Sequence, residues 1–170
     1  GDYKAAEAAF DRQSGLNPGS RSARVNLAAA AAKAGDMDKA IATWKELVRL
    51  MPSRVDLRQQ LADALFGKAD YEGAKFHYDQ ILLIDSKNAE AQNGRGLLLL
   101  RDSKLAAASQ CFKGAIASNP KFVPAYNNLA VTLERMNKRK EAIAYLERAA
   151  KLDPENVEVQ QNLKRMKSAG

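Results

Sequence analysis

Hydrophobic positions along the chain follow a helical period that is broken at regular places. Within residues 55–88 a first apolar stripe recurs at i, i+4, i+7 and i+8, which is the pattern of an amphipathic helix. It consists of Leu57, Leu61, Ala64 and Leu65. After a break at Ala69-Asp70, a second stripe consists of Tyr71, Ala74, Tyr78, Ile81 and Leu82. The pattern predicts two helices joined by a short turn.

The same helix–turn–helix pattern returns with a 34-residue period along the chain. A column of small residues is formed by Ala6, Ala40, Ala74, Ala108 and Ala142. Four residues later comes a column of large residues, namely Phe10, Trp44, Tyr78, Phe112 and Leu146. The units are separated by Pro18, Pro52, Pro120 and Pro154, with Ser86 at the remaining place. One helix pair cannot bury its apolar face alone, so we expect the units to stack as an array.

These columns resemble the tetratricopeptide repeat, whose signature places small and large residues at fixed offsets. The resemblance rests on Leu27-Ala28, Gly35-Asp36, Ala40, Trp44 and Pro52, and again on Leu129-Ala130, Ala142, Leu146 and Pro154. It implies an all-α fold, a right-handed superhelical solenoid of antiparallel helix pairs in 34-residue units. In that family the first helices line a concave face and the second helices form the convex face.

The repeats organise the whole chain, which we expect to form a single domain over residues 1–170. Its expected parts are a partial repeat (1–20), four full repeats (21–54, 55–88, 89–122 and 123–156) and a C-terminal capping helix (157–170). Gly1 corresponds to the turn of a repeat whose first helix is missing, so we expect a fragment of a longer array. Polar residues on the last helix predict a solvated cap.

The third full repeat departs most from the pattern. Arg95 stands at a usually apolar position, and Gly94 and Gly96 lie inside the first helix, where Gly costs about 0.5–1 kcal/mol relative to Ala. Two interpretations stay open. Either this repeat is locally looser, or its backbone approaches another group closely.

Composition and charge narrow the classes of function. The chain is 46% hydrophobic, with 6% aromatic residues and a formal charge of +7. No apolar run reaches the roughly 18–20 residues of a membrane span. The net charge per segment is −1 (1–20), +4 (21–54), −2 (55–88), +3 (89–122), +1 (123–156) and +2 (157–170). This diluted and interrupted pattern favours an ordinary basic surface over a phosphate-binding face. We expect a cytoplasmic location; a periplasmic one stays open if a signal was removed.

The resemblance implies a peptide-binding groove along the first helices. Its expected residues are Val25, Asn26, Ala29, Lys33, Gln59, Gln60, Asp63, Phe66, Asn93, Leu97, Leu100, Arg101, Asn127, Asn128, Val131, Arg135 and Asn162. The sixth position of the repeats carries the carboxamides Asn26, Gln60, Asn128 and Asn162, with Gly94 between them. An amide offers both a donor and an acceptor, so this ladder would satisfy an extended peptide backbone. The alternative is that amides are simply good solvated helix residues.

The basic residues at the thirteenth position also have two interpretations. Arg101 and Arg135, with Lys33 in an earlier repeat, would either meet acidic groups of a ligand or stabilise helix C-termini. The carboxylate clamp of chaperone-binding repeats needs Lys, Asn and Arg at set places, and no register of this chain supplies it. We therefore do not expect binding of a chaperone tail.

Catalysis has no support in the sequence. His77 and Cys111 hold the same position in neighbouring repeats, but two unrelated residues at a half-buried position are the simpler interpretation. No metal or cofactor motif is present, because further ligands at suitable spacing are missing. We expect a scaffold or adaptor that binds a protein or peptide partner. Self-association through the partial repeat is the alternative, and nucleic acid is disfavoured because acidic groups of the groove would repel phosphates.

Overall fold

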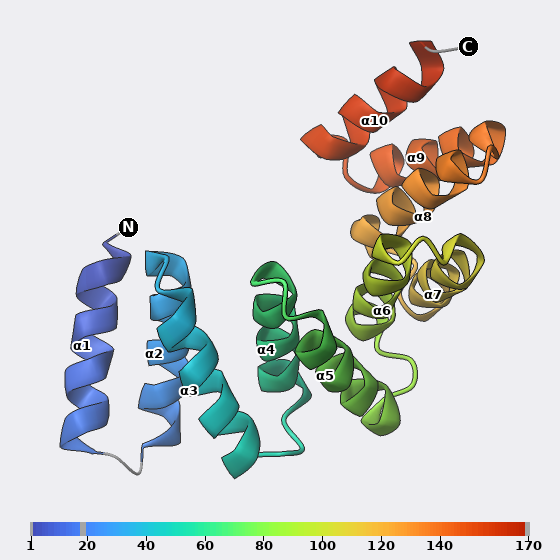
Figure 1. Cartoon of the computed structure of the whole chain (residues 1–170). Helices are drawn as coiled ribbons and strands as arrows, with labels where there is room; N and C mark the ends of the chain where they lie inside the picture. The colour runs from blue at the N-terminus through green and yellow to red at the C-terminus, as the bar shows by residue number, and fades with distance from the viewer. Residues whose placement is uncertain (1, 18–19, 169–170) are drawn as a thin grey trace. The chain divides into compact units, whose positions relative to one another are not determined.

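The computed structural model describes residues 2–17 and 20–168. In these ranges it consists of ten α-helices and contains no strand (Figure 1). Their bounds are α1 (Tyr3–Leu16), α2 (Arg21–Ala34), α3 (Met37–Leu50), α4 (Val55–Gly67), α5 (Tyr71–Ile84), α6 (Ala89–Arg101), α7 (Leu105–Ser118), α8 (Val123–Arg135), α9 (Arg139–Leu152) and α10 (Val157–Ser168). The predicted all-α fold of helix pairs is confirmed, and each full repeat contains one pair.

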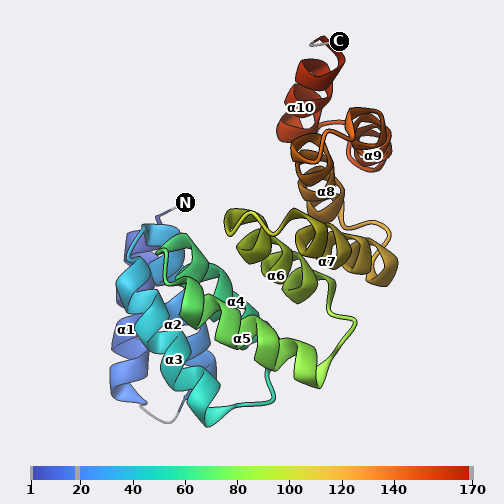
Figure 2. The same ribbon diagram turned by 45° about the vertical axis from the view of Figure 1, so that its right-hand side comes forward.

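The chain divides into two compact units, which we call unit 1 (Gly1–Ile84) and unit 2 (Asp85–Gly170). Within unit 1, α1 to α5 pack in sequence order, each against the next. Within unit 2, α6 to α10 follow one another in the same way (Figure 2). The first helices α6 and α8 also contact each other. The expectations of one domain and of a right-handed superhelix stay predictions.

The two periodic columns of the sequence form the interior of each repeat. In the full repeats the small column is fully buried, at Ala40, Ala74, Ala108 and Ala142. The large column is buried as well, at Trp44, Tyr78, Phe112 and Leu146. Alanine lets the two helix backbones approach, and the larger side chain four residues later fills the space beside it. The 34-residue period of the sequence thus reflects the same pair of buried packing positions in each full repeat.

Gly96 shows which interpretation of the irregular third repeat is correct. A Cβ on this residue would lie 2.5 Å from Cε1 and 2.8 Å from Cδ1 and Cζ of Phe112, whose side chain is fully buried. The first helix of this repeat therefore approaches the aromatic ring with its backbone. Only glycine, which has no Cβ, allows the backbone to approach a neighbouring group this closely.

The turn inside each full repeat has one left-handed residue at the same place. These residues are Gly35, Ala69, Ser103 and Asn137, with φ of 90°, 62°, 57° and 61°. The next amide then reaches back to the preceding helix, as in Asp70 N to Leu65 O at 2.9 Å and Lys138 N to Leu133 O at 2.8 Å. This bond ends the first helix by satisfying one of its last carbonyls. The break predicted at Ala69-Asp70 is confirmed, and it recurs with the predicted 34-residue period.

Ala69→Gly is expected to raise the free energy of unfolding by about 1 kcal/mol, because Ala69 pays a steric cost for its positive φ that glycine does not pay. Urea denaturation of the full chain measures the change. Ala42→Gly on the exposed side of α3 is the matched control, and there the same type of substitution lowers stability by about 1 kcal/mol. Equal losses in both variants would contradict the prediction.

A second repeated contact closes the loop between successive repeats. The fourth residue of a repeat donates to the backbone carbonyl six residues earlier. The pairs are Arg58 Nη2 to Pro52 O (2.9 Å), Gln92 Nε2 to Ser86 O (2.7 Å), Tyr126 Oη to Pro120 O (2.9 Å) and Gln160 Nε2 to Pro154 O (3.1 Å). These donors cannot be recognised from the sequence, because the residue type changes from repeat to repeat while the donor function is kept.

Candidate binding surface of the first helices

The predicted groove residues all lie on the first helices, α2 and α4 in unit 1 and α6, α8 and α10 in unit 2. Most are exposed or half-buried, whereas Asn93 and Asn127 are buried, with exposed fractions of 8% and 4%. The two buried asparagines need hydrogen-bond partners, because an unpaired buried amide is costly. Those partners come from neighbouring repeats.

In unit 2 the amides bond to one another across the first helices. Asn128 donates from Nδ2 to Asn93 Oδ1 at 2.9 Å, and Asn162 donates from Nδ2 to Asn127 Oδ1 at 2.8 Å. Asn127 in turn donates to Glu158 Oε1 at 2.8 Å. The side chain at the sixth position of one repeat thus donates a hydrogen bond to the side chain at the fifth position of the repeat before it. Part of the donor capacity expected for a ligand is used to join the first helices together.

An apolar strip lies beside these amides in unit 2. It is formed by Leu97, Leu100 and Val131, all half-buried. Leu97 and Leu100 rest on the hydrophobic core of the unit, which contains Phe112 and Leu129, so part of each side chain belongs to that core. Leu97 follows Asn93 by four residues and Val131 follows Asn128 by three, so these apolar side chains lie on the same helix faces as the amides.

The arginines of unit 2 connect one first helix to the next. Arg135 donates from Nη1 to the Leu100 carbonyl and from Nη2 to Ser103 Oγ, both at 3.1 Å. It therefore stabilises the C-terminal end of a helix, as one interpretation predicted, but this is the end of α6 and not of its own helix. Arg165 makes two hydrogen bonds to Glu134, at 2.7 and 2.8 Å, which hold the pKa of the Glu134 carboxyl below its usual value.

In unit 1 the corresponding face has two parts. On α4, Asp63 Oδ1 accepts hydrogen bonds from Gln59 Nε2 at 2.9 Å and from the buried Tyr78 Oη at 2.7 Å. Phe66 stacks edge-on against Tyr71, with ring centroids 5.5 Å apart. On α2, the predicted residues Asn26, Ala29 and Lys33 line an open hollow of about 300 Å³ together with α1.

Family models match most of the chain. Three models described as tetratricopeptide repeats match residues 1–54, 31–98 and 123–156. The chain belongs to the tetratricopeptide repeat family. The matched segments include the first helices of three full TPR repeats, so the predicted family and its helix assignment are confirmed.

A curated relative of the TPR chain is distant in sequence. The DnaJ homolog subfamily C member 7 homolog of Dictyostelium discoideum is 25% identical over 119 residues, which is 68% of this chain and 22% of the relative. The chain thus spans about a fifth of that protein's length.

Two solved structures show the shared fold. TTC0263, a TPR protein of Thermus thermophilus, is 22% identical, with a TM-score of 0.79 over 98% of this chain and 91% of that one. YrrB, described as a TPR protein with an unusual peptide-binding site, is 18% identical, with a TM-score of 0.71 over 96% of this chain and 84% of that one. At this identity the likeness establishes the TPR fold alone.

Two reactive residues of the TPR chain have surroundings that favour their neutral forms. His77 Nδ1 lies 3.5 Å from Arg58 Nη1, and burial, together with the charges of Arg58 and Lys45, lowers the pKa of His77 to about 4. Burial raises the pKa of the Cys111 thiol, although the nearby Arg95 opposes this effect. His77 belongs to unit 1 and Cys111 to unit 2. The charged residues that shift each pKa lie in the same unit as the group on which they act.

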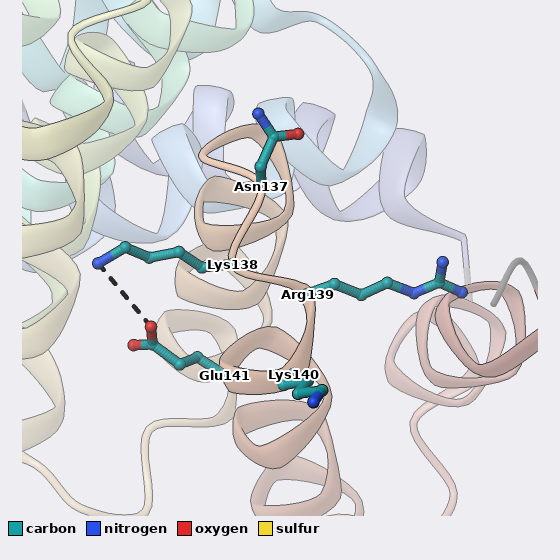
Figure 3. A pocket seen from close by; sticks show the side chains of 5 residues that line it. All are labelled: Asn137, Lys138, Arg139, Lys140 and Glu141. Atoms are coloured by element: carbon teal, nitrogen blue, oxygen red, sulfur yellow. Dashed lines mark ion pairs between the residues drawn. The ribbon is translucent and has the colours of Figure 1, made fainter.

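A second hollow lies at the turn between α8 and α9, but its side chains do not converge on a common point. Figure 3 shows Lys138 directed toward Glu141, while Arg139 and Lys140 extend in other directions. Lys138 Nζ lies 3.8 Å from Glu141 Oε1, and Arg139 donates from Nε to the Met166 carbonyl at 2.7 Å. Lys138 is thus paired within its own repeat, and Arg139 joins this turn to the last turns of α10.

The described residues contain neither a cluster of metal ligands nor a helix that could span a membrane. Across residues 2–17 and 20–168, no three His, Cys, Asp or Glu side chains gather as a metal site requires. None of the helices in the described part of the chain combines the length and the apolar character that crossing a membrane needs.

Proposed function

We propose that this TPR chain is a protein-interaction scaffold whose unit 2 holds an extended segment of a partner polypeptide against α6, α8 and α10. The amide network carries the proposal, because Asn93–Asn128 and Asn127–Asn162 fix the first helices relative to one another before a ligand arrives. A preformed surface loses less conformational entropy on binding. TPR proteins are typically non-enzymatic scaffolds, and YrrB is described as having a peptide-binding site.

The chemistry of the face fits a peptide backbone with apolar side chains. Asn128 and Asn162 each use one amide hydrogen within the network. Their Oδ1 atoms have no hydrogen bond from the described residues, and a carboxamide oxygen accepts from a peptide N–H. The strip of Leu97, Leu100 and Val131 lies on the same helices and would receive apolar side chains. Backbone contacts give affinity, and apolar contacts give selectivity.

Peptides selected against the full chain from a random display library test this proposal. Val131→Arg places a long charged side chain on the apolar strip, and we expect it to weaken binding at least tenfold. Ala144→Arg on an exposed position of α9 makes the same chemical change outside the face and serves as the matched control. Fluorescence anisotropy with labelled peptides, repeated at high salt, measures both variants.

Retention at high salt in the parent chain, with loss only in Val131→Arg, is the expected result. Equal binding by both variants would place the peptides elsewhere and contradict the proposal. Selection of no peptide, together with salt-sensitive binding of an unstructured RNA, would favour an electrostatic nucleic-acid surface instead.

A further inference from the structure

The helix α5 of unit 1 carries apolar residues on its outward side as well as on its buried side. Phe76 and Leu83 are seven residues apart, which places them on the same side of a helix. They are 57% and 78% exposed, and the neighbouring Ile84 is 53% exposed. We call these three residues the outward face of α5. A surface helix is normally polar on this side, so large exposed apolar groups indicate a site of interaction.

The repeat pattern shows that the outward face of α5 does not belong to the stacking surface between repeats. Phe76 and Leu83 stand at the twenty-second and twenty-ninth positions of their repeat. In the other full repeats both positions are exposed, although α4 packs against α3 and α8 packs against α7. The residues at these positions are Ala42, Arg49, Gln110, Ala117, Ala144 and Lys151. Stacking of a following repeat therefore leaves both positions in solvent.

A hydrogen-bond donor lies beside the outward face of α5. The ring of His77 contacts the ring of Phe76 edge-on, with centroids 5.1 Å apart. On its other side, His77 Nδ1 lies 3.5 Å from Arg58 Nη1. A guanidinium group can only donate, so Nδ1 is the acceptor and the neutral ring carries its proton on Nε2. This Nε2–H group has no acceptor among the described residues.

The guanidinium behind this ring lacks the carboxylate that its counterpart has. Arg58 is only 7% exposed, and its buried Nε has no hydrogen-bond partner among the described residues. In the preceding repeat the equivalent arginine is Arg24, whose Nη1 lies 3.6 Å from Glu46 Oε2. The residue equivalent to Glu46 is Gln80, which is neutral. The positive charge of Arg58 is therefore not balanced in the way that the charge of Arg24 is.

A second positive charge comes from α3. Lys45 is exposed, forms no ion pair with the described residues, and is one of the charges that lower the pKa of His77. Arg49 follows one turn later on the same side of α3 and is also exposed. The carboxylate of Asp70 acts on His77 in the opposite sense, but it already accepts a hydrogen bond from Gly73 N at 2.9 Å. A basic region thus borders the outward face of α5.

We propose that the outward face of α5 binds an acidic amphipathic helix of a partner protein, whose apolar residues pack on Phe76 and Leu83 and whose carboxylates meet His77 Nε2–H and Lys45. Phe76 and Leu83 are about 10 Å apart along the helix axis, which corresponds to two turns of a partner helix laid along α5. Carboxylates are the matching acceptors, because they form strong hydrogen bonds with charged and ring N–H donors. The proposal is independent of the proposed function, which concerns unit 2.

A second copy of this chain fits the same face poorly. A symmetric pair would place the basic groups Lys45 and Arg49 of both copies close together, and like charges across an interface are unfavourable. The whole chain also has a formal charge of +7, which favours acidic partners over a basic one. A different protein with acidic groups is for these reasons the occupant to which the proposal commits.

A displayed library of amphipathic helices, with fixed leucines at i, i+4 and i+7 and randomised positions on both flanks, is the probe. It is selected on the full chain and depleted on the Phe76→Ser/Leu83→Ser variant. We expect the remaining helices to be enriched in Asp and Glu at the flanking positions. In fluorescence anisotropy, these helices are expected to bind the double variant at least tenfold more weakly than the parent, and Lys45→Gln several-fold more weakly.

A matched control makes the same changes in the next repeat. Gln110→Ser/Ala117→Ser alters the same two repeat positions on α7, where both residues are exposed, and is expected to bind as the parent does. Val131→Arg in unit 2 is likewise expected to leave this binding unchanged. The double variant of α5 is expected to keep the melting temperature of the parent, because its two substituted side chains are exposed. Its loss of binding then reports the contact and not the fold.

Four results would overturn the proposal. They are a selection that yields no helix dependent on the outward face of α5, a selection whose remaining helices are not enriched in acidic residues, binding of phosphatidylserine vesicles in place of acidic helices that the double variant loses, and self-association of the free chain that the double variant abolishes. The third result would assign this face to a membrane surface, and the fourth to a second copy of the chain.

Discussion

Gly96→Ala is expected to lower the free energy of unfolding by about 2 kcal/mol or more, although alanine is the better helix former. In an open helix this substitution raises stability by up to about 1 kcal/mol. Here the new methyl group would stand 2.5 Å from Cε1 of Phe112, whose side chain is fully buried. Because protein interiors are close-packed, a shift of this ring displaces its neighbours as well. Overpacking of a tight core costs about 1–3 kcal/mol, occasionally more, and exceeds the gain in helix propensity.

Denaturation of the full chain by guanidinium chloride measures this change, with Gly67→Ala as the matched control. A Cβ on Gly67 meets no heavy atom within 4 Å, so that variant is expected to be as stable as the parent or slightly more stable. Combining Gly96→Ala with Phe112→Leu makes room for the methyl group, and the two losses are expected to be less than additive. Simple additivity would contradict a contact between the two side chains.

Acidification from pH 7 to pH 4.5 is expected to destabilise the chain through His77 by about 2 kcal/mol. The pKa of His77 is about 4 in the folded chain, against an ordinary value of 6.5, because burial and the nearby Arg58 and Lys45 disfavour the imidazolium. The unfolded chain then binds the proton more readily, so the contribution is fully present above pH 6.5 and is lost as the pH falls toward 4. Each pKa unit corresponds to about 1.4 kcal/mol, and partial solvent access to the ring reduces the effect.

The comparison with His77→Gln isolates this effect from the titration of carboxylates. Because the variant lacks the titrating group, its free energy of unfolding is expected to change less than that of the parent across this range. The pKa of His77 is measured directly from the pH dependence of its imidazole NMR signals. A value near 6.5, with parallel stability curves for the two proteins, would show that Arg58 and burial do not act on the ring as described.

The face of the first helices was only partly predictable from the sequence. The resemblance to TPR repeats gave the helices on which Asn128, Asn162 and Arg135 lie, since these follow from the 34-residue register. It did not reveal that Asn128 and Asn162 bond to Asn93 and Asn127. The members of each pair are 35 residues apart in the chain, and their distance in space depends on how successive repeats stack. The two interpretations of Arg135 were also separated only by its contact with the end of α6.

What the sequence alone determined is the set of local features. The helical stripes, the turns at Gly35, Ala69, Ser103 and Asn137, and the small and large columns all arise from interactions within one 34-residue unit. The tertiary structure decided which backbone approaches which ring at Gly96 and which amides pair in unit 2. These features depend on contacts between helices, whose distances are set by side-chain packing in three dimensions and do not follow from periodicity.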